Sequence, residues 1–122
     1  MTPPAEPAPL LHLTTPAAWE QAQRDGSYTA DSLRTEGFIH CSDPHQVLAV
    51  ANIRFTGRTD LILLWLDAAR VAAPIRYENL EGGTDLFPHI YGALNLDAVI
   101  AVTPFRPSAD GTFGDDQLTP VS

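Results

Sequence analysis

The sequence has no lysine and a single cysteine, Cys41, among its 122 residues. Without lysine, neither a lysine Schiff base nor the lysine of a phosphate-binding P-loop is available, and one cysteine excludes a disulfide within the chain. No apolar run approaches the roughly 20 residues of a membrane span. The first residues also lack the basic and apolar regions of a signal peptide. We therefore expect a cytoplasmic protein with no membrane partner.

Basic side chains are scarce in general. Seven arginines are outnumbered by 15 acidic residues, which gives a formal net charge of −8. Nonspecific nucleic-acid binding needs a basic face that neutralises phosphates, so we expect neither DNA nor RNA as a nonspecific partner. The acidic balance favours solubility, and it stays compatible with a small-molecule ligand that is anionic and is held by a few arginines or by helix N-termini.

Length and composition predict one domain. With 122 residues and a hydrophobic fraction of 44%, the chain can bury a core without disulfides or metal. We place the single globular domain at residues 9–107. Flexible tails are expected at residues 1–8 and 108–122, where the composition is poor in core-forming residues.

Capping signals predict the helices. Thr15 and Pro16 supply an N-cap and a first helical residue for a helix that ends near Gly26. Residues 43–46 have the pattern of a capping box, which predicts another helix from the second of them onward. A short helix or turn is expected to begin at Asp31.

Hydrophobic patterns predict the strands. Apolar or alternating segments lie at residues 10–14, 38–41, 60–67, 74–78 and 98–105. The segment at 60–67 is apolar on both faces, which is typical of a central, buried strand. Two glycines at 82–83 begin a loop that we expect to run through Pro88. The order of elements predicts an α+β fold, with two to three helices packed on mixed or antiparallel sheets.

Three of the four histidines lie in apolar segments, namely His12, His40 and His89. Imidazole donates and accepts hydrogen bonds and titrates near neutrality, so three such groups brought together would form a site. Side chains alternate along a strand. If the residues next to each histidine face the core, His12 and His40 both point to the other side. Those neighbouring residues are Leu11, Leu13, Ile39 and Cys41.

The neighbourhood of Cys41 does not predict metal or thiol chemistry. Adjacent residues in a strand point to opposite faces, so His40 and Cys41 would not share a metal ion, and their spacing to His45 matches no usual zinc pattern. We expect Cys41 to be an unreactive buried thiol and His45 to be exposed. A metal site made by His12, His40 and His89 stays open as an alternative.

Glu78 ends a predicted strand, ahead of the loop that returns to His89. A carboxylate beside histidines can stabilise positive charge in a transition state. A solvated glutamate and a loop histidine bonded to backbone fit the sequence equally well. Glu81, three residues further on, is the alternative carboxylate.

At these residues the chain resembles a bacterial family called domain of unknown function 952. The most specific motifs are Gly-Phe-Ile-His-Cys-Ser at 37–42 and Phe-Pro-His-Ile-Tyr-Gly at 87–92, and the resemblance covers residues 10–106. The family has no established activity. The resemblance implies a fold similar to that of ADP-ribosyltransferases, including the NAD-using tRNA 2′-phosphotransferases.

That kinship implies an NAD-type cleft between two small sheets. His12, His40 and Glu78 occupy the matching positions on the first strand, the second strand and a late strand, and His89 completes the implied catalytic set. The residues implied to bind the cofactor are Ser42, Tyr77 and Tyr91, with either tyrosine as an aromatic platform. Breaking the nicotinamide–ribose bond builds an oxocarbenium-like ribose that a carboxylate stabilises.

Three functions therefore compete. The first is an NAD-dependent ADP-ribosyl-transfer-type enzyme, although the chain lacks the Glu-x-Glu or Gln-x-Glu pair of the arginine-specific transferases. The second is a non-catalytic module that binds a small ligand in the same cleft. The third is a metal-dependent enzyme that uses the three histidines.

Overall fold

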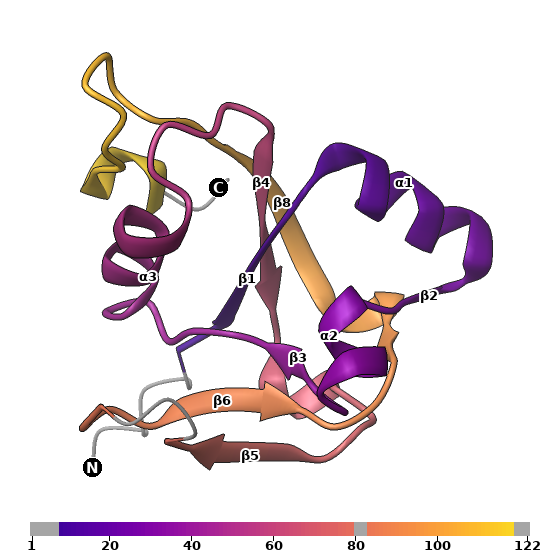
Figure 1. The fold of residues 1–122 in the computed structure, drawn as a ribbon. Coiled ribbons are helices and arrows are strands. Elements are labelled where there is room, and N and C mark those ends of the chain that lie inside the picture. Colours follow the sequence, from indigo (N-terminus) through magenta and orange to yellow (C-terminus); the bar gives the residue numbers. More distant parts are fainter. Residues whose placement is uncertain (1–7, 80–82, 119–122) are drawn as a thin grey trace, which may run out of the picture.

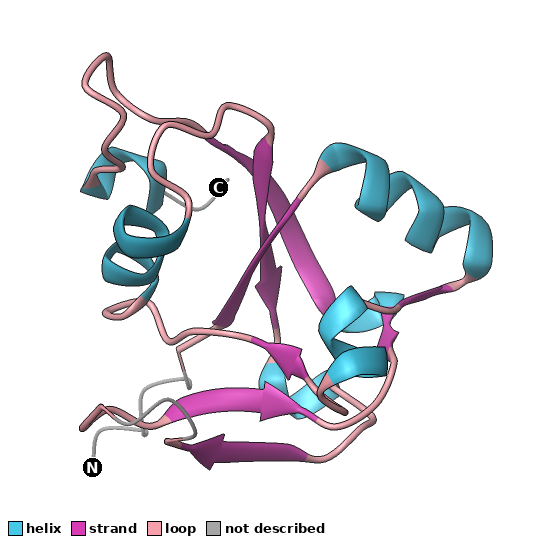
Figure 2. Ribbon diagram, viewed as in Figure 1, coloured by secondary structure: helices cyan, strands magenta, loops and turns pink. Residues whose placement is uncertain are grey.

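A computed structural model describes residues 8–79 and 83–118 of the chain. Its strands form three antiparallel sheets (Figure 1, Figure 2). The first sheet has the order β1-β4-β8, with β1 at Leu10–Thr14, β4 at Leu61–Leu66 and β8 at Val99–Phe105. The second has the order β3-β6-β5, with β3 at Ile39–His40, β6 at Phe87–Ile90 and β5 at Ile75–Glu78. A third pair joins β2 (Ser27–Tyr28) to β7 (Leu94–Asn95).

Helices surround these sheets. The described residues contain three α-helices, which are α1 at Pro16–Asp25, α2 at Asp31–Thr35 and α3 at Val47–Arg54. Short 3-10 helices follow at Ala68–Arg70 (η1), Leu96–Ala98 (η2) and Asp115–Leu118 (η3). The predicted α+β fold with antiparallel sheets is confirmed. Within the described ranges, no helix has the length and apolar character needed to cross a membrane.

Local signals explain where α1 and α3 begin. The Thr15 hydroxyl accepts a hydrogen bond from the N–H group of Ala18, and α1 ends at Gly26, whose φ of 82° places it in the left-handed region. At α3 only half of the predicted capping box forms. The side chain of Gln46 accepts a hydrogen bond from the N–H group of Asp43 at 2.9 Å. The residues between them form a turn, so α3 begins three residues later than the pattern predicts.

The core lies on both faces of the first sheet. One cluster contains Leu10, Leu64 and Leu66, packed beneath α1, and the other contains Leu63, Trp65 and Phe105 on the side of α3. The middle position of β4 confirms the prediction of a central, buried strand. Because both faces are covered, every side chain of β1 is buried or half-buried.

From the sequence we assumed that the residues next to His12 on β1 and next to His40 on β3 face the same core. This assumption is wrong. Leu11 belongs to the cluster on the α3 side, whereas Ile39 and Cys41 belong to the cluster under α1. The two segments meet at Leu11 and Ser42, which exchange two backbone hydrogen bonds of 2.8 Å. This bridge joins the first sheet to the second, and it brings β1 beside β3 in an orientation that alternation within single strands does not predict.

The loop expected to run through Pro88 ends earlier, because β6 begins at Phe87. Proline lacks an N–H group and is rare in a central strand. Here Pro88 lies opposite Tyr77, and its carbonyl accepts a hydrogen bond from the N–H group of Cys41 at 3.0 Å. Pairing on both sides therefore holds β6 in the sheet, and His89 is a strand residue rather than a loop residue.

The expected domain end at residue 107 is also too early. Phe113 is only 4% exposed, and its ring stacks on Phe105 with centroids 4.6 Å apart. The backbone of Phe113 exchanges hydrogen bonds of 2.8 and 3.1 Å with the side chain of Asn52. The chain after residue 107 is therefore part of the core through η3. Residues 1–7 and 119–122, where flexible tails were predicted, lie outside the described residues.

Candidate functional site

A cavity of about 210 Å³ lies between β1, α3 and the second sheet. Four predicted catalytic residues line it, which are His12, His40, Glu78 and His89, and so does Ser42 from the predicted cofactor set. The apolar part of the lining consists of Leu11, Leu13, Val47, Val50, Phe55 and Phe87, and the lining also includes Ser32, Cys41 and Arg54. An apolar cavity into which a few polar groups converge is the usual form of a small-molecule site.

The second sheet aligns the polar groups by its register. His40 on β3 lies opposite His89 on β6, which in turn lies opposite Arg76 on β5. Side chains alternate along each strand, so the intervening isoleucines of the three strands point the other way, into the core cluster under α1. The sheet therefore has one apolar face and one face of histidines and charged residues.

His89 and Glu78 form the inner pair of this polar face. The Nδ1–H group of His89 donates to Glu78 Oε1 at 3.1 Å, and the side chains are 4% and 24% exposed. Tyr91 donates its hydroxyl proton to the same oxygen. These two hydrogen bonds, that of Tyr91 foremost, hold the pKa of Glu78 below its ordinary value, so the carboxyl is ionised at neutral pH.

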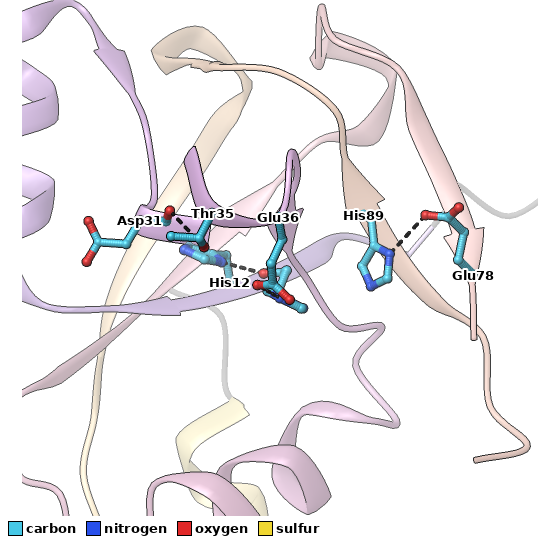
Figure 3. Close-up of polar contacts among 7 residues, drawn as sticks. His12, Asp31, Thr35, Glu36, Glu78 and His89 are labelled. Carbon is cyan, nitrogen blue, oxygen red and sulfur yellow. Dashed lines mark hydrogen bonds and ion pairs between the residues drawn. The ribbon is translucent and has the colours of Figure 1, made fainter. Parts of the chain in front are cut away.

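Glu78 and Phe38 together fix the ring of His89. Phe38 stacks on it with centroids 4.1 Å apart and an interplanar angle of 21°. Figure 3 shows Nδ1 directed at Glu78 while the other ring nitrogen, Nε2, points away from the carboxylate. No group among residues 8–79 and 83–118 donates a hydrogen bond to Nε2 or accepts one from it. This nitrogen is therefore available to a ligand.

His40 and Glu36 form an outer pair. The Nε2–H group of His40 donates to Glu36 Oε2 at 2.8 Å, and the side chains are 39% and 49% exposed. The rings of His40 and His89 lie edge to face with centroids 5.3 Å apart. Sequence reasoning missed Glu36. The available signal was its position four residues before His40, across a turn at Gly37 whose φ is 89°.

His12 lies in the cavity wall but has no free ring nitrogen. Burial lowers its pKa from 6.5 to about 4, so the ring is neutral at pH 7 and carries one proton. A carbonyl only accepts, so that proton is on Nδ1, which donates to the His40 carbonyl at 2.6 Å. Nε2 then accepts from the hydroxyl of Tyr28 at 2.8 Å. His12 thus holds the backbone of His40 in place, and its catalytic role stays a prediction.

The predicted aromatic platforms are not in the cavity lining. Tyr77 donates its hydroxyl proton to Asp43 Oδ1 at 2.9 Å, on the sheet face opposite the histidines. One face of Tyr91 is covered by the guanidinium of Arg76, 4.9 Å from the ring centroid. Tyr91 therefore acts on the site through Glu78. Glu81, the alternative carboxylate, lies outside the described residues.

The thiol and the remaining histidine behave as expected. Cys41 is 4% exposed, and burial raises the pKa of its thiol, which agrees with the prediction of an unreactive group. His45 is exposed. In the part of the chain that the structure describes, no three His, Cys, Asp or Glu side chains are arranged to hold a metal ion.

Comparison with known proteins agrees with the motifs. A family model described as "Protein of unknown function (DUF952)" matches residues 13–102. The chain belongs to this family. The DUF952 chain is also similar to the protein CC0527 from Caulobacter crescentus, at 26% identity. The crystal structures of CC0527 and of a double mutant cover 91% of this chain and 97% of theirs with a TM-score of 0.80. The solution structure of CC0527 matches with a TM-score of 0.78 and covers 91% of this chain and 96% of its own. A comparison with curated proteins gave no match.

Proposed function

We propose that the cavity is the active site of an enzyme that acts on a small organic ligand by histidine acid–base chemistry. The observation that carries this proposal is the double pairing of His40 with Glu36 and His89 with Glu78, with the two imidazoles 5.3 Å apart at one cavity. A carboxylate that accepts from one ring nitrogen fixes the tautomer and the orientation of an imidazole, so the other nitrogen can take or give a proton.

The two pairs suit different tasks. His89 is buried and is held by Glu78 and Phe38, so its Nε2 is the better placed general base for a bound ligand. His40 is more than a third exposed, so it can exchange protons with water. To complete the acid–base cycle, the proton that His89 takes from the ligand passes to His40, whose ring centroid lies 5.3 Å away, and from there to water.

We propose an NAD-type nucleotide as the ligand, on the strength of the resemblance to ADP-ribosyltransferases. In such a reaction the bond between ribose C1′ and the nicotinamide nitrogen breaks, and its electron pair leaves with nicotinamide. The oxygen of an acceptor or of water bonds to C1′, and its proton passes to Nε2 of His89. The ionised Glu78 supplies the negative charge that stabilises the ribosyl cation.

A non-catalytic binding module is the second candidate. Both ring nitrogens of His12 are used within the protein, and one oxygen of Glu78 already accepts two hydrogen bonds. Such internal satisfaction is also what a rigid binding pocket needs. The metal-dependent alternative has less support, because His12 would have to break its bonds to His40 and Tyr28 before it could bind an ion.

Calorimetric titration with NAD, ADP-ribose and divalent metal ions tests these functions, together with chromatography of released nicotinamide. We expect NAD to bind and to be hydrolysed slowly, with water as the acceptor. His89→Ala should reduce nicotinamide release by about 100-fold or more. Glu78→Gln should bind NAD but release little nicotinamide, whereas the exposed control Glu20→Gln should behave as wild type.

Each other outcome selects a different function. If NAD binds equally to wild type and Glu78→Gln and neither consumes it, the enzyme proposal fails and the binding module is correct. If neither NAD nor ADP-ribose binds, the nucleotide proposal is wrong. Heat released by a divalent metal ion, and lost in His12→Gln, would instead support the metal-dependent alternative.

A further inference from the structure

A second cavity of about 220 Å³ adjoins the first. Leu13 and Phe55 line both cavities, so the two cavities meet at these side chains. From there the second cavity extends toward α1 and the start of α2, where its polar lining consists of Thr14, Thr15, Tyr28, Thr29, Asp31 and Arg58. The second cavity is therefore much richer in hydroxyl groups than the first.

A chain of hydrogen bonds crosses from one cavity to the other. His12 lines the first cavity, and Tyr28 and Thr14 line the second. The hydroxyl of Tyr28 lies 2.8 Å from Nε2 of His12 and 2.9 Å from the hydroxyl oxygen of Thr14. Burial raises the pKa of Tyr28, so the phenol keeps its proton at neutral pH.

The protonation of His12 sets the direction of this chain. Because Nε2 of neutral His12 can only accept, Tyr28 donates its one proton there. Thr14 must then donate its own hydroxyl proton to the oxygen of Tyr28. The lone pairs of Thr14 are left as the acceptor end of the chain, at the lining of the second cavity. A ligand group that donates a hydrogen bond fits this end.

The charges of the second cavity favour a neutral ligand group. Arg58 is bound by both carboxylate oxygens of Asp60, at 2.8 and 2.6 Å. Asp31 accepts from Arg34 at 3.1 Å. Each charged side chain of the lining therefore has a partner of opposite sign. A phosphate or a cation would gain less here than a neutral group with several hydroxyls, such as a ribose.

We propose that the two cavities bind the two ends of one elongated ligand. One end lies beside His89, and a neutral, hydroxyl-bearing end lies beside Thr14, with the connection passing Leu13 and Phe55. At about 210 and 220 Å³, each cavity alone falls below the ~300–1,000 Å³ of typical ligand sites, whereas the pair falls within that range. The assignment of the first end rests on the proposed function, and that of the second does not.

Nuclear magnetic resonance of the full chain tests the second cavity independently of catalysis. D-ribose and NAD are titrated separately, and the amide signals of Thr14, Thr29 and Asp31 are followed. Both probes should shift these signals in wild type and in His89→Ala. Thr29→Trp, which places an indole at an exposed position of the lining, should weaken NAD binding at least tenfold. The control Ala17→Trp adds the same group at an exposed α1 position outside both cavities and should change nothing.

A pair of variants at Thr14 distinguishes the effect of its acceptor oxygen from the effect of side-chain size. Thr14→Ser keeps the acceptor oxygen and should retain the ribose-induced shifts, whereas Thr14→Val removes it and should lose them. The inference is overturned if neither probe shifts signals around the second cavity, or if Thr29→Trp leaves NAD affinity unchanged while His89→Ala alters NAD turnover. That second result would leave the proposed function intact. Ribose shifts without any NAD consumption would support the second cavity and contradict the catalytic proposal.

Discussion

Acidification from pH 7 to pH 5 is expected to destabilise the protein through His12. His12 is 7% exposed, and burial lowers its pKa from 6.5 to about 4. In the unfolded chain the imidazole takes up a proton below pH 6.5, whereas in the folded protein it stays neutral until about pH 4. The unfolded state therefore binds more protons between pH 6.5 and pH 4. The contribution of His12 to the free energy of unfolding is fully present above pH 6.5 and is lost as the pH falls toward 4.

The size of this effect follows from the shift in pKa. The full loss is about 3 kcal/mol, and it is reached below about pH 4, where His12 is protonated in the folded protein as well. About 2 kcal/mol of it is expected at pH 5, a large part of the roughly 5–15 kcal/mol that stabilises a typical domain. Urea unfolding followed by fluorescence of the two tryptophans measures it directly, as a lower midpoint at pH 5 than at pH 7.

The variant His12→Gln separates this effect from other titrations. A glutamine amide can donate to the His40 carbonyl and accept from Tyr28, but it does not titrate. Its free energy of unfolding should therefore change less between pH 7 and pH 5 than that of wild type, by about 2 kcal/mol. Equal losses in the two proteins would refute the assignment of His12 as the neutral, buried group.

Three further predictions concern single residues. Gly37→Ala should lower the stability of the protein by about 1–2 kcal/mol, measured as a lower Tm, because the φ of 89° disfavours any residue with a Cβ even where that atom meets open space. Gly83→Ala, at an equally open position without positive φ, is the control and should leave Tm nearly unchanged. Phe113→Ala should cost about 3–5 kcal/mol in urea unfolding, whereas the 81% exposed Ile53→Ala should cost about 0.5 kcal/mol or less. Tyr91→Phe removes a hydrogen bond that lowers the pKa of Glu78, so the acidic limb of the nicotinamide-release profile should move to higher pH; an unmoved limb would exclude Glu78 as the titrating group.

Elements with strong local signals were predictable. The threonine–proline pair and Gly26 mark both ends of α1, because capping and left-handed geometry are decided within a few residues. The segment of β4 is apolar on both faces, and only a central strand buries both. In each case the physical cause lies within the segment itself, so the sequence alone indicates the structure.

Elements that depend on distant partners were not predictable. Pro88 argues against a central strand locally, yet β6 forms because β3 and β5 pair with it from both sides. Phe113 lies in a segment rich in glycine and aspartate, and its burial depends on Phe105 and Asn52. The pairing of Glu36 with His40 likewise requires the turn at Gly37. These contacts are decided by packing between elements, which propensity does not contain.

The same distinction separates the three histidines of the cavity. His12 is explained by structure alone, since both nitrogens bond within the protein and fix the backbone of β3. His89 is as deeply buried, but only one nitrogen is used, and its partner is an ionised carboxylate. The lowered pKa of Glu78 means that its contacts with Tyr91 and His89 stabilise the ionised carboxylate in the fold. The same contact fixes Nδ1 of His89 and leaves Nε2 to the cavity. Under the proposed function, this arrangement also holds a base ready for a ligand.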